Sequence, residues 1–97
     1  MQETISLSSK IRINEDVVSR NLQGQIVLLN LKTNLYCGLD NVGAKIWRLL
    51  NEQANKHKLL KDVLSELVKE FDVSEAKCTE DLLNFVRMLK EKDLIEI

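Results

Sequence analysis

The spacing of apolar residues changes once along this chain, at Asp40. Before Asp40, apolar and polar residues alternate in short pieces such as 5–7 and 11–13, and many of the apolar ones are β-branched. A period of two indicates strands, because successive side chains of a strand point to opposite faces. After Asp40, apolar residues recur every three or four positions, which indicates helices. The pattern therefore predicts an α+β domain in which three strands precede three helices.

The strands are expected at 17–22, 25–31 and 34–39. Gly24 lies in a turn that joins the first two strands as a hairpin. Residues 26–29 are apolar on both faces, which is typical of a central strand. The strand at 34–39 comes last, so we expect it at the edge of the sheet, with backbone N–H and C=O groups left unpaired.

Asp40 is well placed to cap the first helix, where its carboxylate accepts hydrogen bonds from free amides. Trp47 is expected on the flank of this helix, closing the space beside the sheet while its indole N–H finds an acceptor. A polar stretch at 51–58 precedes the second helix, expected at 59–71. Both helices carry regular apolar stripes, made of Val42, Ile46, Leu49 and Leu50 in the first and of Leu60, Val63, Leu64, Leu67, Val68 and Phe71 in the second.

The third helix is expected to start after the capping residue Ser74 and to extend to about Lys90. With Leu83 and Met88 on its two sides, its apolar arc widens to roughly 220°, about double what a helix with one buried side needs. Either the first two helices bury different sides of this arc, or one side forms the floor of a groove. Asp81 lies inside the arc, where we favour a solvated rim position over a contact with a ligand. The central stripe of the arc consists of Cys78, Leu82, Phe85, Val86 and Leu89.

Composition favours one domain with one core over 1–97, since the chain has 97 residues and 44% of them are hydrophobic. The 14 Lys and Arg residues are interleaved with 15 Asp and Glu residues. A broad positive face is therefore not expected, and nucleic acid is disfavoured as a partner. No apolar run has the length of a signal peptide or a membrane span, so we expect a soluble, cytoplasmic protein without a membrane partner.

Motifs for catalysis are missing from the sequence, which has no Gly-rich phosphate loop, no HExxH and no CxxC. Cys37 and Cys78 are too few and too far apart for a disulfide framework or a four-ligand zinc site, and we expect reduced, buried packing residues. His57 lies in a polar stretch and is expected to be a solvated surface residue. We therefore expect no catalytic residue, no metal, no cofactor and no enzymatic activity.

Four stretches together resemble the PqqD-like family, the small peptide-recognition domains of pathways that make ribosomally synthesised and post-translationally modified peptides. The stretches are LYCGLD at 35–40, VGAKIWRLL at 42–50, LVKEFDVS at 67–74 and EDLLNFVRMLKEKDLI at 80–95. The resemblance covers about 17–97, and residues 1–16 are an N-terminal strand or an extension. Its sharpest elements are Tyr36, Leu39, Ile46, Trp47, Leu50, Asp81, Leu89 and Leu94.

The resemblance implies a winged helix-turn-helix-like fold, with a three-stranded antiparallel sheet followed by three helices. It also implies binding of the leader segment of a precursor peptide, as a strand added at 34–39 with side chains reaching the third helix. A stand-alone domain is most similar to the leader-binding protein of lasso-peptide pathways, whose partner is a cysteine-protease-like leader peptidase. The peptide-binding residues implied in this way are Asn34, Leu35, Tyr36 and Cys37 at the edge, Leu82, Phe85, Val86 and Leu89 in the groove, and Asp81 at its mouth.

Other functions stay open on the sequence alone. The same resemblance allows a peptide chaperone of the type found in pyrroloquinoline quinone (PQQ) synthesis, whose partner is a radical SAM enzyme. A winged helix can also bind DNA, and an open strand edge can pair with a second copy of the chain. Cys37 and Gly38 are smaller than the residues common in this strand of the family, which leaves the register of a bound peptide open.

Overall fold

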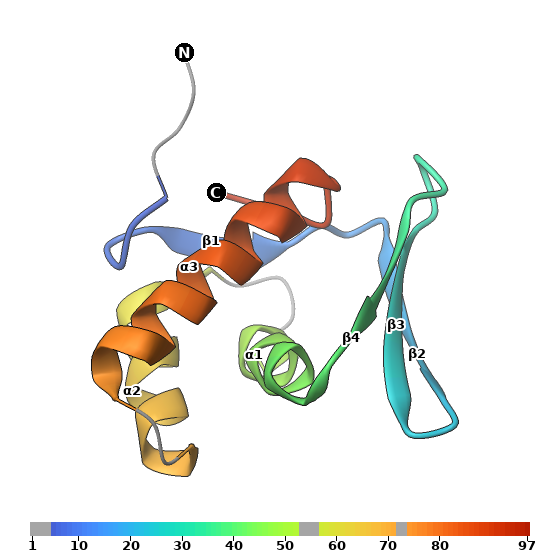
Figure 1. The fold of residues 1–97 in the computed structure, drawn as a ribbon. Helices are drawn as coiled ribbons and strands as arrows, with labels where there is room; N and C mark the ends of the chain where they lie inside the picture. Colours follow the sequence, from blue (N-terminus) through green and yellow to red (C-terminus); the bar gives the residue numbers. More distant parts are fainter. Residues whose placement is uncertain (1–4, 53–56, 72–73) are drawn as a thin grey trace.

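The computed structural model describes residues 5–52, 57–71 and 74–97. Residues 1–4 of the N-terminal segment, residues 53–56 of the polar stretch and residues 72–73 lie outside this description. The elements, shown in Figure 1, are β1 (Lys10–Ile13), β2 (Val17–Leu22), β3 (Gln25–Asn30), β4 (Tyr36–Leu39), α1 (Asn41–Asn51), β5 (Lys58–Leu59), α2 (Leu60–Glu70), α3 (Glu75–Glu91) and β6 (Ile95–Glu96).

Two antiparallel three-stranded sheets organise these elements. The sheet in the order β2-β3-β4 is the predicted meander, and its strands begin and end within two residues of their predicted positions. The second sheet, in the order β5-β1-β6, was not predicted as a sheet. Its outer strands β5 and β6 are two residues long, and β5 is too short for a period of two to be visible in the sequence. The α+β class, the antiparallel meander and the three helices are confirmed.

The N-terminal segment belongs to the core more fully than the resemblance implied. Residues 10–13 form β1, which pairs with both β5 and β6. Ile11 in the middle of β1 is fully buried. The compact unit therefore begins before Val17, and of the two alternatives for 1–16 the structure makes 10–13 a strand.

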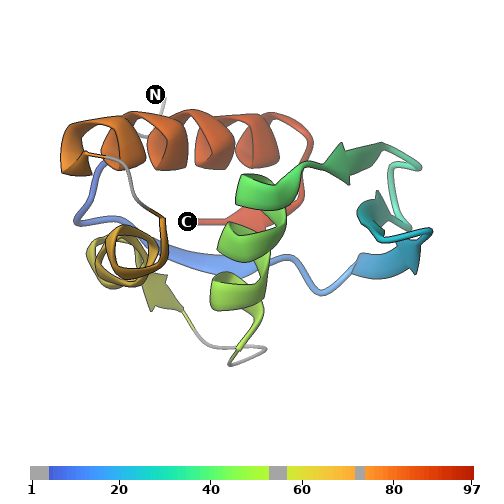
Figure 2. The same ribbon diagram turned by 60° about the horizontal axis from the view of Figure 1, so that its bottom comes forward.

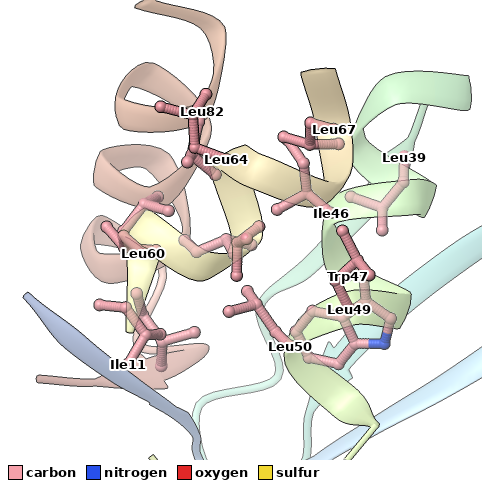
Figure 3. Close-up of a cluster of buried hydrophobic side chains, with 14 of the residues drawn as sticks. Ile11, Leu39, Ile46, Trp47, Leu49, Leu50, Leu60, Leu64, Leu67 and Leu82 are labelled. Carbon is pink, nitrogen blue, oxygen red and sulfur yellow. The ribbon is translucent and has the colours of Figure 1, made fainter. Parts of the chain in front are cut away.

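The hydrophobic core lies where the three helices meet β1 and the inner face of the β2-β3-β4 sheet. Figure 3 shows side chains of α1, α2 and α3 gathered between Ile11 of β1 and Leu39 of β4. Trp47 is 3% exposed and is part of this cluster. Its indole N–H, which was expected to find an acceptor, has no hydrogen-bond partner among the described residues. Packing of the ring, rather than a polar contact, holds Trp47 in place.

The two predicted helix caps are confirmed. The Asp40 carboxylate accepts a hydrogen bond from the Gly43 backbone N–H at 2.7 Å, and the Ser74 hydroxyl accepts one from the Lys77 N–H at 3.2 Å. Within the described residues, no helix is both long enough and apolar enough to span a membrane.

The wide apolar arc of α3 is divided between two environments. Cys78, Leu82, Val86 and Leu89 are buried, and α2 packs along this side. Phe85 and Met88, on one flank of the arc, are only partly buried. Burial against other helices, the first of the two alternatives for this arc, therefore accounts for its centre. The flank formed by Phe85 and Met88 remains at the surface beside β4.

Candidate functional site

The exposed edge of β4 is the first part of the site. Within the described residues, β4 pairs with β3 on one side and with no strand on the other. Strand β1 does not cover this edge, because it pairs with β5 and β6 instead. In Figures 1 and 2 the β2-β3-β4 sheet lies at one side of the molecule, with β4 on the side of α1. The edge strand predicted at 34–39 is thus confirmed.

Backbone hydrogen bonds show which groups of β4 face the open edge. The Asn30 N–H donates to the Leu35 carbonyl at 2.9 Å, and on the other side of β3 the Leu31 N–H donates to the Asp16 carbonyl at 2.9 Å. Bonded and non-bonded pairs alternate along an antiparallel ladder. Leu35 and Cys37 therefore point their backbone groups toward β3, and Tyr36 and Gly38 point theirs outward.

This alternation along β4 corrects the prediction of which backbone groups are free to pair with a guest strand. Among Leu35, Tyr36 and Cys37, only Tyr36 presents its backbone to the open edge, and Gly38 is the second residue that does so. Asn34 is also engaged within the chain, since its N–H donates to the Asn30 carbonyl at 2.8 Å. The free edge is accordingly formed by alternate residues, Tyr36 and Gly38.

The side chains of β4 separate into two faces. Cys37 and Leu39 point inward, and the Cys37 Sγ lies 3.6 Å from the Met88 Sδ of α3. Burial raises the pKa of the Cys37 thiol, against the opposing effect of the Lys92 charge, so the thiol stays neutral at neutral pH. Cys37 is therefore a partly buried contact between β4 and α3, whereas Cys78 is the buried packing residue that was predicted.

A groove between the start of α1 and α3 is the second part of the site, called here the α3 groove. It has a volume of about 230 Å³ and is lined by Asp40, Val42, Gly43, Ile46, Asp81, Asn84 and Phe85. A smaller hollow of about 70 Å³ shares Val42 and Asp81 with it and continues to Leu67 of α2 and to Phe71 just after α2. Asp81, Asn84, Phe85 and Met88 follow helical spacing along one stripe of α3, which ends beside Cys37. The groove and the edge of β4 are thus connected along α3.

Gly43 allows α1 and α3 to approach closely at the floor of the groove. A Cβ at this position would lie 2.9 Å from Cε1 of Phe85, closer than real Cβ contacts. The ring of Phe85 therefore lies against the backbone of α1. This close contact fixes the position of the one aromatic side chain in the α3 groove.

Asp81 lies at the rim, as favoured from the sequence. Its carboxylate is 3.1 Å from the Lys77 Nζ, and its side chain is 39% exposed. The hydrogen bond and charge of Asp81 raise the pKa of Lys77, with a further contribution from Glu80. An exposed pair of this kind contributes little stability, so Asp81 remains available to a polar group at the groove.

The other predicted groove residues serve the core. Leu82, Val86 and Leu89 are each 0% exposed and support the groove from beneath instead of lining it. Asn84, Met88 and Gly38 were not predicted as site residues. Asn84 is three residues beyond Asp81 on the same helix stripe, so its helical spacing from Asp81 could have identified it from the sequence.

Asn30 connects the sheet to the end of α3. Its side-chain amide donates to the Asp93 carbonyl at 2.7 Å, and its side-chain oxygen accepts from the N–H groups of Lys32 and Thr33. Asn30 itself is 1% exposed, so its amide makes these contacts from the interior. The position of the open edge relative to α3 is therefore set in part by one buried amide.

His57 is exposed, as expected, and lies outside this site. Among the described residues, no group of three or more His, Cys, Asp and Glu side chains is arranged to hold a metal ion. The site offers backbone donors and acceptors, a groove lined by both apolar and polar residues, and a carboxylate at its rim. Such a surface is suited to holding an extended peptide.

Comparisons with known proteins agree with this fold. Two solved structures are similar to this chain. The structure "TbiB1 in Complex with the TbiA(beta) Leader Peptide" has a TM-score of 0.77 and 36% identity, over 88% of this chain and 94% of that one. The structure "Lasso peptide synthetase B1 complexed with the leader peptide" has a TM-score of 0.73 and 23% identity, over 92% of this chain and 100% of that one. A search of curated proteins finds no match. The sequence model of the family described as "Coenzyme PQQ synthesis protein D (PqqD)" matches residues 25–95. The chain therefore belongs to the PqqD family, as the resemblance implied.

Proposed function

We propose that this chain binds the leader segment of a ribosomally made precursor peptide. The observation that carries the proposal is the open edge at Tyr36 and Gly38, which runs beside the α3 groove. TbiB1, which is 36% identical to this chain, has been solved with a leader peptide bound. The similarity in fold and sequence supports the same class of ligand here.

The proposed mode of binding is strand addition to β4. The backbone groups of Tyr36 and Gly38 pair with the guest, which supplies affinity with little dependence on sequence. Guest residues opposite Cys37 point to the inner face, toward Met88 and the α3 groove. Phe85 provides an apolar surface there, and Asp81 provides a carboxylate for a donor or a cationic side chain. Selectivity then comes from alternate guest side chains.

The proposal includes presentation of the leader to a separate enzyme, without chemistry in this chain. A leader peptidase of the lasso-peptide type is our first choice of partner, because both similar structures belong to leader-binding proteins and one of them is a lasso peptide synthetase B1. We also propose action in the cytoplasm. Two unpaired cysteines, Cys37 and Cys78, agree with a reducing compartment.

A PQQ-type peptide chaperone is the second candidate, because the family model is described by PQQ synthesis. The two candidates share the peptide-binding edge and differ in the enzyme that receives the peptide. Pull-down of the chain with its peptide against a lasso-type leader peptidase and against a PQQ-type radical SAM enzyme distinguishes them. Capture of the radical enzyme alone would favour the second candidate.

The direct test is selection of peptides followed by NMR. A displayed pool of leader segments from ribosomally made precursor peptides, including the TbiA(beta) leader, is selected on the folded chain, and enriched peptides are titrated into ¹⁵N-labelled protein. We expect the largest amide shifts in β4 and along the stripe from Asp81 to Met88. Scrambled peptides of the same composition serve as controls. No enrichment, or shifts that avoid β4 at saturating peptide, would refute the proposal.

A further inference from the structure

The outer face of the β2-β3-β4 sheet points away from the helices and is largely apolar. The strand register places two rows of side chains across this face, Val18–Leu29–Tyr36 and Arg20–Val27–Gly38. Val18 is 36% exposed and Tyr36 is 71% exposed, while Val27 and Leu29 are partly buried. Figures 1 and 2 show no helix on this side of the sheet. The second row is the incomplete one, because it ends at a glycine.

Gly38 leaves an open space at the end of its row. A Cβ at Gly38 would meet no atom within 4 Å. The backbone there does not require glycine, since the only glycine with a left-handed φ among the described residues is Gly24. A glycine inside a strand weakens the strand, and it often marks a place where another group approaches closely. We call the surface formed by Val27, Tyr36 and Gly38 on this face the Gly38 notch.

We propose that the Gly38 notch receives a large apolar or aromatic side chain of the guest peptide. This inference rests on the proposed strand addition to β4 and adds the class of peptide that is preferred. A guest residue that pairs with Gly38 projects onto the outer face, because directly opposed residues of neighbouring strands share a face. Its side chain is then in line with Gly38 and Val27.

The spacing of the strands makes this contact sterically reasonable. Two strand spacings separate the guest backbone from β3, about 10 Å in total. A Phe or Tyr side chain that leans over Gly38 can approach the Val27 side chain, because no Cβ of Gly38 is in its path. Aromatic side chains cover glycines on neighbouring edge strands in the same way. Tyr36, two residues before Gly38 on the same face of β4, offers a ring against which the guest side chain packs.

The guest strand therefore makes side-chain contacts on both faces of the β2-β3-β4 sheet. The residue opposite Gly38 packs on the outer face, and its two neighbours point inward, toward Cys37 and the α3 groove. The preferred peptides have a large apolar residue at one outer position. Charged or glycine residues at that position leave Val27 uncovered, so they are expected to bind more weakly.

The test uses Gly38→Val with the peptides enriched from the leader pool. Valine fills the notch and suits a strand, so the melting temperature should equal or exceed that of the wild type. Affinity for a parental peptide should fall by about tenfold or more, because the large guest side chain loses its site. Arg20→Val is the matched control, since it introduces the same residue in the same row on β2, and it should leave affinity unchanged.

A second arm identifies the guest residue. Each enriched peptide is scanned with alanine and titrated by calorimetry into wild type and Gly38→Val. One alanine substitution should weaken binding to the wild type by about tenfold yet cost nothing in Gly38→Val. If Gly38→Val binds every parental peptide as tightly as the wild type while β4 amides still shift, the notch is refuted and strand addition stands. If no peptide shifts β4 amides in the wild type, the proposed function fails, and this inference fails with it.

Discussion

The two three-stranded sheets of this molecule differ most in their edges. In the β5-β1-β6 sheet the outer strands are two residues long, and the central strand carries the fully buried Ile11. In the β2-β3-β4 sheet the outer strands are six and four residues long, and β4 carries Tyr36, 71% exposed. Short edges limit pairing with another chain, whereas longer open edges invite it. One sheet therefore closes the core, and the other offers a surface to a guest.

The comparison also separates the two faces of the β2-β3-β4 sheet. Its inner face contributes Leu28 and Leu39 to the core and Cys37 to the contact with α3. Its outer face contributes nothing to the core cluster in the row of Gly38. A guest strand on β4 extends both faces at once. The five predictions below test this division of labour, from the largest expected effect to the smallest.

Ile11→Ala should cause the largest loss of stability. The substitution removes a buried side chain from the strand that joins β5 and β6, which typically costs about 2–5 kcal/mol. Tyr36→Ala, in the other sheet, should change stability by about 0.5 kcal/mol or less, because the ring is exposed. Urea denaturation of both variants measures the difference. Equal losses would mean that β4 is as structural as β1.

Proline substitutions should distinguish the backbone N–H groups at the open edge of β4 from those that point to β3. Tyr36→Pro removes an outward N–H, so the chain should fold normally and lose detectable binding of an enriched peptide. Cys37→Pro removes an N–H that points to β3, and should destabilise the fold by about 3 kcal/mol or more. Thermal unfolding and calorimetry provide the two measurements.

Ser19→Pro is the matched control for the opposite edge of the same sheet. The pairing of Leu31 with Asp16 sets the phase of β2, in which Ser19 points its N–H outward. This variant should fold and bind peptide like the wild type. Loss of binding in Ser19→Pro but not in Tyr36→Pro would place the guest on β2.

Phe85→Ala should weaken peptide binding by about tenfold, because the ring is the aromatic surface of the α3 groove. His57→Ala should have no effect, since His57 is exposed and outside the site. Titration of the same peptide into both variants compares them. Similar losses in the two variants would show that the wrong surface has been assigned.

Asn30→Asp should have a moderate effect on both stability and binding. Aspartate retains the acceptor for the Lys32 and Thr33 N–H groups and loses the donor to the Asp93 carbonyl. The unsatisfied Asp93 carbonyl and the charge of a buried aspartate together cost at least about 1–3 kcal/mol. Asn14→Ala, which removes a longer bond of 3.2 Å to the same carbonyl, should cost less. A fully stable Asn30→Asp variant would show that the sheet does not depend on this link.

Glu96→Gln should have the smallest effect, and one that depends on pH. The hydrogen bond from Arg12 lowers the pKa of Glu96, with the Arg12 charge acting in the same direction. A lowered pKa stabilises the folded state above the ordinary Glu pKa, and this contribution is lost as the pH falls through the folded value. The two proteins should therefore differ slightly at neutral pH and converge in acid. A difference that grows in acid would contradict this sign.

Much of the fold was predictable because its signals are local. The hairpin at Gly24, the caps at Asp40 and Ser74 and the stripes of three helices each lie within a few consecutive residues. Strand β5 carries no such signal, because a pair of residues has no period, and no local pattern indicates the partner of β5 or of β6. Their pairing with β1 depends on residues more than forty positions away.

The sequence predicted which strand forms the site, but not which residues of that strand point their backbone groups outward. A period of two shows that Tyr36 and Gly38 share a face, yet it does not show which residues point their backbone toward β3. That phase is set by the pairing of Asn30 with Leu35. In the same way, helical spacing could not separate Phe85, which lines the groove, from Val86, which is buried beneath it. Packing of α2 against α3 decides between them.

Hydrogen exchange of individual β4 amides, with and without an enriched leader peptide, tests the central claim most directly. Without peptide, the amides of Tyr36 and Gly38 should exchange faster than that of Cys37, which is paired with β3. With saturating peptide, exchange at Tyr36 and Gly38 should slow by an order of magnitude or more, while Ser19 and Asn21 at the opposite edge stay unchanged. Unchanged exchange at Tyr36 and Gly38 in a saturated complex would contradict the account.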